Sequence, residues 1–189
     1  MQEAAGVRGD VCLVSRIHAF ELHHLPERAA LGCVTVSPMN ALFQKLNFKG
    51  HKAIHILNAP ESFQAAMEEM RPLTAVQTTL ARAKDVQFAL AFATKKAEVD
   101  KFADQIAKAS TGDAAIWIAY PKGTSKKYKC EFNRDNGWDR LGAHGFEPVR
   151  MVAIDEDWSA LRFRRVEHIK KMTRSFALTE AGKAKAAKS

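Results

Sequence analysis

Three near-continuous apolar runs, each followed by a segment of different character, constrain the fold of this chain more than any other feature. The runs are residues 53–60, 85–94 and 115–120. Such runs are typical of parallel strands that are buried on both faces. Strands that alternate with helices favour a mostly parallel sheet with right-handed crossovers. We therefore predict an α/β fold: an open, mostly parallel, Rossmann-like three-layer sandwich with strand order 2-1-3-4 and a closing antiparallel hairpin strand.

The segments between these runs supply the other elements. Apolar residues recur at helical spacing in 61–70 and 95–110, whereas 74–80 is short and β-branched and is predicted as an edge strand. Residues 134–146 predict a short helix, and 149–166 predict two strands that turn at 155–157. The second of these strands alternates, with Leu161 and Phe163 on one face and Arg162 and Arg164 on the other.

Length and composition indicate one domain. The chain has 189 residues, 47% of them hydrophobic, which suits one sizeable core. We predict a single domain over 39–170 and a frayed basic tail over 171–189. Residues 1–38 lack a regular pattern, and our hypothesis is that Met39 is the natural start and that they extend the reading frame upstream. No oligomeric state follows from the sequence.

We expect a cytoplasmic protein without a membrane partner. No apolar run approaches the roughly 20 residues that span a bilayer, and the first residues lack the order of a secretory signal. The three cysteines, Cys12, Cys33 and Cys130, have no framework spacing and are expected to be reduced thiols.

The net charge of +8 and the pI near 9.5 favour an anionic partner. In open parallel sheets, ligands bind beyond the carboxyl ends of the strands. We therefore predict a rim that binds a phosphate- or carboxylate-bearing small molecule, and the alternative is an ordinary set of solvated loops. Neither a dinucleotide glycine pattern nor a Walker loop is present, so no cofactor is expected. The predicted rim consists of Lys95, Lys96, Lys122, Gly123, Thr124, Ser125 and Lys126.

The second interpretation is an interaction module for nucleic acid or an acidic protein. It uses the basic residues of the closing hairpin and the tail, although such charges also keep an edge strand from aggregating. The chain lacks the mixture of aromatic and basic residues that single-strand binders use. The residues concerned are Arg162, Arg164, Arg165, Lys170, Lys171, Arg174, Lys183, Lys185 and Lys188.

Enzymatic activity is the least favoured interpretation, and no catalytic residue is assigned. Asp155, Glu156 and Asp157 have the chemistry of acid/base groups, but three consecutive acids between strands are more often a solvated turn. Cys130 lies near lysines that would lower its thiol pKa, although an inert loop cysteine is the simpler interpretation. We expect no metal site: the spacings match no closed zinc site among Cys12, His18, His23, His24 and Cys33.

Two motifs, "WIAYPKGTSKK" and "VRMVAIDEDWSALRFRRV", resemble a bacterial family of domains of unknown function, number three thousand and fifty-two in that series. Trp117, Pro121 and Lys122 match the first motif of the family. The second motif is matched by Asp155, Trp158 and Ser159. The resemblance covers about 52–166 and implies no activity. It implies that the two motifs belong together, with Trp117 near Trp158 and Lys122 held at the rim.

Overall fold

The computed structural model describes residues 40–171 and 177–187, and these belong to one compact unit, Ser37–Ser189. The hypothesis that residues 1–38 are an upstream extension concerns residues outside this description. The division into a domain over 39–170 and a tail stays a prediction. Among the described residues, no helix has the length and apolar character needed to cross a bilayer.

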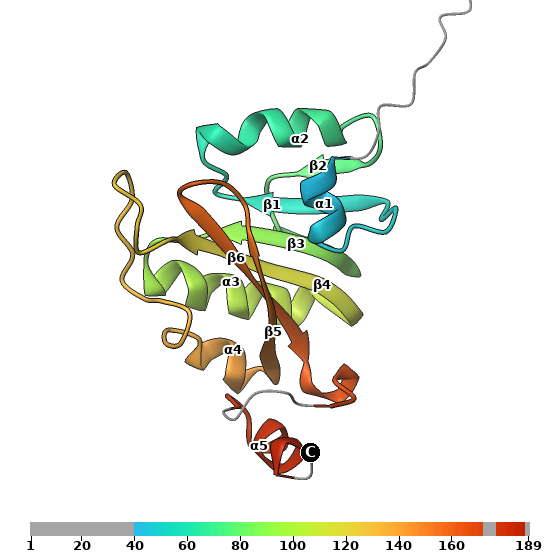
Figure 1. Ribbon diagram of the computed structural model, residues 1–189. Helices are drawn as coiled ribbons and strands as arrows, with labels where there is room; N and C mark the ends of the chain where they lie inside the picture. The colour runs from blue at the N-terminus through green and yellow to red at the C-terminus, as the bar shows by residue number, and fades with distance from the viewer. Residues whose placement is uncertain (1–39, 172–176, 188–189) are drawn as a thin grey trace, which may run out of the picture. The chain divides into compact units, whose positions relative to one another are not determined.

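Six strands form one open sheet, and their order confirms the predicted topology (Figure 1). The order is β2-β1-β3-β4-β6-β5. The first four strands are parallel, and β6 and β5 close the sheet as an antiparallel hairpin. The strands are β1 (Ala53–Leu57), β2 (Ala75–Gln77), β3 (Val86–Phe92), β4 (Ser110–Pro121), β5 (Phe146–Ala153) and β6 (Trp158–Arg165).

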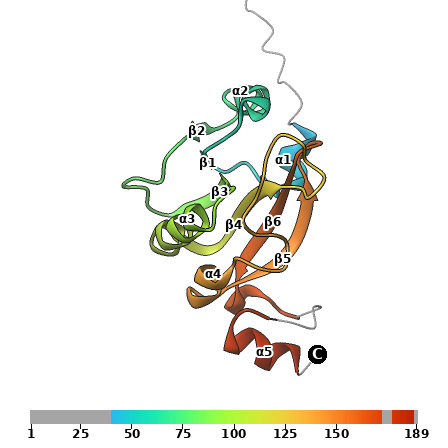
Figure 2. The ribbon, with the colours of Figure 1, turned by 90° about the vertical axis from the view of Figure 1, so that its left-hand side faces the viewer.

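Helices cover both faces of the sheet, as Figure 2 shows. On one face lie α1 (Ala41–Lys45) and α2 (Gln64–Met70), which follows a 3-10 turn at Glu61–Phe63. On the other lie α3 (Lys96–Ala109) and α4 (Asp139–Ala143). The chain ends with a 3-10 turn at Val166–His168 and with α5 (Glu180–Ala186). The fold is therefore the predicted open α/β sandwich.

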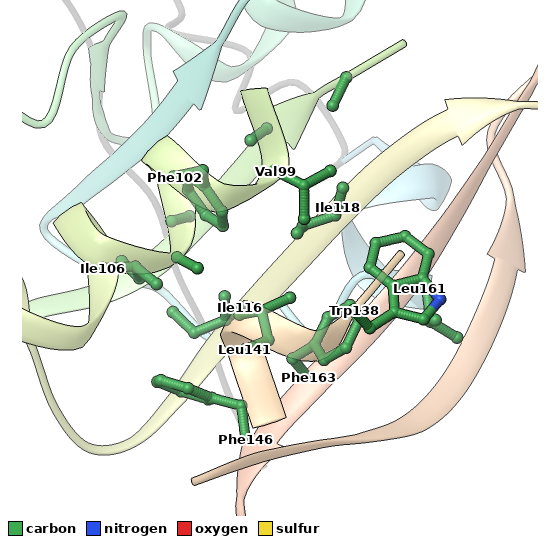
Figure 3. Packing of buried hydrophobic residues seen from close by; sticks show 14 of the residues in the cluster. Val99, Phe102, Ile106, Ile116, Ile118, Trp138, Leu141, Phe146, Leu161 and Phe163 are labelled. Atoms are coloured by element: carbon green, nitrogen blue, oxygen red, sulfur yellow. The ribbon is translucent and has the colours of Figure 1, made fainter. Parts of the chain in front are cut away.

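The two faces of the central strands differ in side-chain size. On β3, Phe88, Leu90 and Phe92 face α1 and α2, whereas the face under α3 carries Ala89 and Ala91. Small residues on a strand let a helix approach closely. The core on that side is completed by β4, β6 and α4, and Figure 3 shows its apolar side chains gathered between α3 and the sheet.

Two segments differ from their predictions. β4 starts at Ser110, directly after α3 and ahead of the predicted run 115–120, and exposed Thr111 and Asp113 belong to the strand. The prediction of a frayed tail is wrong for residues 177–187. There, buried Glu147 on β5 accepts hydrogen bonds from the Leu178 and Thr179 N–H groups at 3.0 and 2.7 Å and from the Thr179 hydroxyl at 2.7 Å.

Candidate ligand sites at the carboxyl edge of the sheet

The carboxyl edge of the sheet contains a topological switch between β1 and β3. After β1 the chain crosses to α2 on one face, and after β3 it crosses to α3 on the other. Asn58 ends β1 in the left-handed region, at φ 53°, and its amide donates to the Phe92 carbonyl across the switch at 3.4 Å. Asparagine tolerates this backbone region better than most residues. In sheets of this kind, ligands bind at such a switch.

The loop after β4 is fastened to the turn between β5 and β6. The Lys122 ammonium donates to the Asp155 carbonyl at 2.6 Å, and the Lys122 N–H donates to the Asp157 carbonyl at 2.8 Å. The Ser125 hydroxyl donates to the Asp157 carboxylate at 2.8 Å, and Lys127 lies 3.8 Å from its other oxygen. Ser125 and Lys127 are therefore already engaged with an acidic residue 30 or more positions further along the chain.

The acidic turn itself has a structural role. One Asp155 oxygen accepts the backbone N–H groups of Asp157 and Trp158 at 2.8 and 2.7 Å, which shapes the turn. Glu156 is exposed. The interpretation of these acids as a turn, rather than as an acid/base pair, agrees with these contacts.

The two motifs of the family resemblance meet where the loop after β4 is held to the turn between β5 and β6. Pro121 pairs with Trp158, and Tyr120 with Ser159, on adjacent strands. Trp117 and Trp158 belong to the same apolar cluster, but the ring contacts of Trp158 are with Phe92 and Tyr128, at centroid distances of 5.1 and 4.9 Å.

Lys95 and Lys96 lie at the start of α3, where two carboxylates already occupy the helix end. Glu98 accepts the Thr94 and Lys95 N–H groups at 2.8 and 3.0 Å, and Glu131 accepts the Lys96 N–H at 2.9 Å. Although burial opposes it, hydrogen bonds from the backbone of Lys95 and Thr94 lower the pKa of Glu98. The Lys96 ammonium is paired with Asp139 at 3.1 Å. This helix terminus is thus unsuited to phosphate, because carboxylates fill the place of the anion.

A cleft of about 940 Å³ lies at the ends of β4 and β6, beneath the loop 121–135. Of the predicted rim, it is lined by Lys122, Gly123 and Ser125, whereas Thr124, Lys126, Lys95 and Lys96 are not among its lining residues. Lys129 and Arg134 add positive charge that the prediction missed. The sequence contained a signal for these two residues, because the polar loop continues beyond residue 127 and carries both of them. We call this the cationic cleft.

Cys130 also lines the cationic cleft. Burial of this half-buried side chain raises the pKa of its thiol above the usual value. This direction agrees with the favoured interpretation of an inert loop cysteine and not with the alternative of a pKa lowered by lysines, because desolvation of the thiolate is the larger effect. A protonated thiol is a poor nucleophile at neutral pH.

The zinc-type residues of the sequence, Cys12 to Cys33, lie outside the described residues. Within the described part, no group of three or more histidine, cysteine or acidic residues is placed to hold a metal ion.

The basic residues of the hairpin and the chain end have mixed environments. Arg164 forms a two-pronged ion pair with Asp113. Arg165 donates to the Ala107 carbonyl, and Lys185 donates to two backbone carbonyls near the end of β6. Lys170 and Lys171 are exposed, whereas Arg174 and Lys188 lie outside the described residues.

No protein-family model and no curated protein matches the chain. Solved structures match weakly. A SAM-dependent methyltransferase from Aquifex aeolicus has 11% identity and a TM-score of 0.44 over 66% of this chain and 87% of that one. A type 11 methyltransferase, so described provisionally, from Sulfolobus solfataricus has 6% identity and a TM-score of 0.40, over 68% and 94%. A protein in the NADB-Rossmann superfamily from Streptococcus agalactiae has 10% identity and a TM-score of 0.36, over 68% and 69%. These values assign neither an activity nor a ligand to this chain.

Proposed function

We propose that this protein is a ligand-binding domain, and not an enzyme, and that its ligand is a small anion held in the cationic cleft. The single observation that carries the proposal is the set of cations around one concave surface at the carboxyl edge. Lys122, Lys129 and Arg134 line it, and within the described part of the chain neither Lys122 nor Lys129 is paired with a carboxylate. A phosphate or carboxylate would supply the missing counter-charge.

The cations that line the cleft are not equally available to bind an anion. Arg134 is paired with the adjacent Asp135 at 3.0 Å, and Glu131, which also lines the cleft, uses one oxygen on the Lys96 N–H. The ammonium of half-buried Lys122 is held in place by a neutral carbonyl, so no carboxylate of the described residues compensates its charge. Lys129 is exposed and contributes a second contact. Two unpaired cations suit a dianionic group better than a single carboxylate.

A thermal-shift screen of the full chain tests the proposal. The probes are inorganic phosphate, sugar phosphates, nucleotides and dicarboxylates. A ligand at 100 times its dissociation constant adds about 2.7 kcal/mol of stability. We expect a stabilising probe whose effect is reduced in Lys129→Ala and lost in Lys122→Met with Lys129→Ala. Lys126→Ala is the matched control, since this neighbouring exposed lysine is not among the residues that line the cleft. Absence of any stabilising probe, or an equal loss in the control, would overturn the proposal.

A specific observation on the hairpin favours a second candidate, the binding of nucleic acid or an acidic protein. Arg162 lies opposite Trp117 on β4 and Arg150 on β5. Its Nε is buried without a hydrogen-bond partner in the described residues. Burial is the main cause that lowers its pKa; the charge of Asp113 opposes this effect, and the charges of Arg164 and Arg150 add to it. A polyanion bound at exposed Arg150 would relieve the repulsion between these arginines.

Salt-dependent retention on a heparin column and on immobilised RNA tests this second candidate. Phosphate contacts by arginines give a steep salt dependence. We expect Arg150→Ala to elute at lower salt than the wild type, and Arg71→Ala, whose arginine is paired with Glu68 on α2, to elute unchanged. A flat salt response, or equal shifts in both variants, would remove the candidate.

A further inference from the structure

A separate cavity of about 380 Å³ lies at the topological switch, on the face of the sheet that α3 covers. Its walls are the ends of β1 and β3, the segment after β2 and the first half of α3. The crossover after β2 contains no helix and runs over the same face, where buried Leu80 belongs to the core cluster under α3. We call this space the switch-point cavity. Its volume is within the range of small-molecule sites.

The cavity exists because the floor is made of small residues. Ala91 on β3 and Ala93 directly after it line the cavity, together with Val99 and Phe102 on α3. Larger side chains at the two alanine positions would fill the space between strand and helix. The result is a slot with an apolar floor and with Phe92 and Phe102 among its lining residues, which suits a flat ring system.

The polar groups of the cavity favour a ligand that donates hydrogen bonds. Glu98 lines it, and one of its oxygens, Oε2, accepts the two N–H groups that precede α3. Its other oxygen, Oε1, accepts no hydrogen bond from any described residue. The neutral polar residues that line the cavity are Asn58, Thr78, Thr79 and Gln105, and exposed Lys101 lies at its rim.

This arrangement disfavours an anion inside the cavity. The hydrogen bonds that hold Glu98 keep it ionised, and a carboxylate facing a partly enclosed space repels phosphate while it attracts hydroxyl and amino groups. The switch-point cavity and the cationic cleft therefore have opposite preferences. They lie on either side of the start of α3, where Glu98 borders the cavity and Glu131 borders the cleft.

We propose that the switch-point cavity binds an uncharged molecule of nucleoside type, with its flat ring against the alanine floor and a hydroxyl or amino group donating to Glu98. This site is distinct from the anion site of the proposed function, and neither depends on the other. A charge-assisted hydrogen bond to a carboxylate is stronger than a neutral one, so Glu98 is the main polar determinant of the site.

Isothermal titration calorimetry with the full chain tests the proposal. The probes are adenosine, guanosine, cytidine and uridine, together with their 5′-monophosphates. We expect at least one nucleoside to bind and its affinity to fall roughly tenfold or more in Glu98→Gln. Glu131→Gln is the matched control: this carboxylate also accepts an N–H at the start of α3, but it is not among the residues that line the cavity. It should bind the nucleoside as the wild type does.

A second variant keeps the test decisive if Glu98→Gln fails to fold. Ala93→Leu places a larger apolar side chain in the cavity, retains the helix cap and should abolish nucleoside binding. The proposal is overturned if no nucleoside binds, if Ala93→Leu binds as well as the wild type, or if Glu98→Gln and Glu131→Gln bind equally. Tighter binding of a monophosphate than of its nucleoside, measured in Lys122→Met with Lys129→Ala so that the cationic cleft does not contribute, would overturn the assignment to an uncharged ligand. The cationic cleft is tested separately, by its own variants at Lys122 and Lys129.

Discussion

Gly182→Ala sets helix propensity against docking of the chain end. Gly182 is buried within α5, and a Cβ at this position would collide with the Glu147 carboxylate and lie 2.8 Å from the Thr179 hydroxyl oxygen. In an exposed helix, replacing glycine with alanine would stabilise the helix by about 1 kcal/mol. Here the new methyl group pushes α5 away from the carboxylate that holds it. The sign of the effect therefore depends on how many hydrogen bonds to Glu147 are lost.

The structure allows a rough magnitude. Glu147 accepts three hydrogen bonds from Leu178 and Thr179, all at 3.0 Å or less. A hydrogen bond to a charged group contributes about 1.5–3 kcal/mol, so the loss of two costs about 3 kcal/mol or more. Set against the gain in propensity of about 1 kcal/mol, local docking weakens by about 2 kcal/mol, which corresponds to roughly a 30-fold change in the equilibrium constant.

Hydrogen exchange at the Leu178 and Thr179 amides measures this change directly, because these N–H groups are the donors to Glu147. We expect their protection to fall roughly 30-fold in Gly182→Ala, while protection in β3 stays unchanged. Ala181→Gly is the control, since it lowers propensity in the same helix at an exposed position. Greater protection of the two amides in Gly182→Ala than in the wild type would refute the docking argument and leave propensity as the dominant effect.

Three further predictions concern single groups. Asp155→Ala removes the acceptor of two backbone N–H groups, so the free energy of unfolding in urea should fall by about 1–2 kcal/mol. Hydrogen bonds from Arg140 and His144 lower the pKa of Asp104 to about 2. Because this folded pKa lies below the unfolded value, its stabilisation is present above about pH 4 and is lost as the pH falls toward 2. Urea titrations should show a shallower loss over this range in Asp104→Asn. Burial raises the pKa of Cys130, so site-resolved mass spectrometry should find slower alkylation than for a free thiol at pH 7.5, with the rate rising above pH 9.

The fold could be predicted from the sequence wherever burial left an apolar run or an alternating pattern. The apolar runs predicted β1, β3 and β4, and the alternation of Leu161 and Phe163 with arginines predicted the face of β6 that enters the core. Local polarity misled at the start of β4. Thr111 to Asp113 have the composition of a turn, but Asp113 is held in the strand by Arg164, 51 positions away. A contact at that separation leaves no periodic trace in the sequence.

The candidate site was less predictable, because charges count only together with their partners. The predicted rim gathered cations by loop position. In the fold, Lys96 is paired with Asp139, and Ser125 is bound to Asp157. The start of α3 is also unavailable to an anion, and this had a local signal in the sequence. Glu98 lies at the third position of α3, where a glutamate commonly caps the start of a helix. That signal indicates a helix terminus already satisfied by its own side chain.

The same capping decides the chemistry on both sides of α3. Had the start of this helix been uncapped, its N–H groups would have formed one continuous anion site with the lysines after β4. Glu98 and Glu131 instead place negative charge between the two spaces. In the two proposed sites, this charge would confine an anion to the side of Lys122 and favour hydrogen-bond donors on the side of Asn58. The net charge of +8 does not predict the binding preference of the cationic cleft or of the switch-point cavity, because that preference depends on the few ionised groups that line each one.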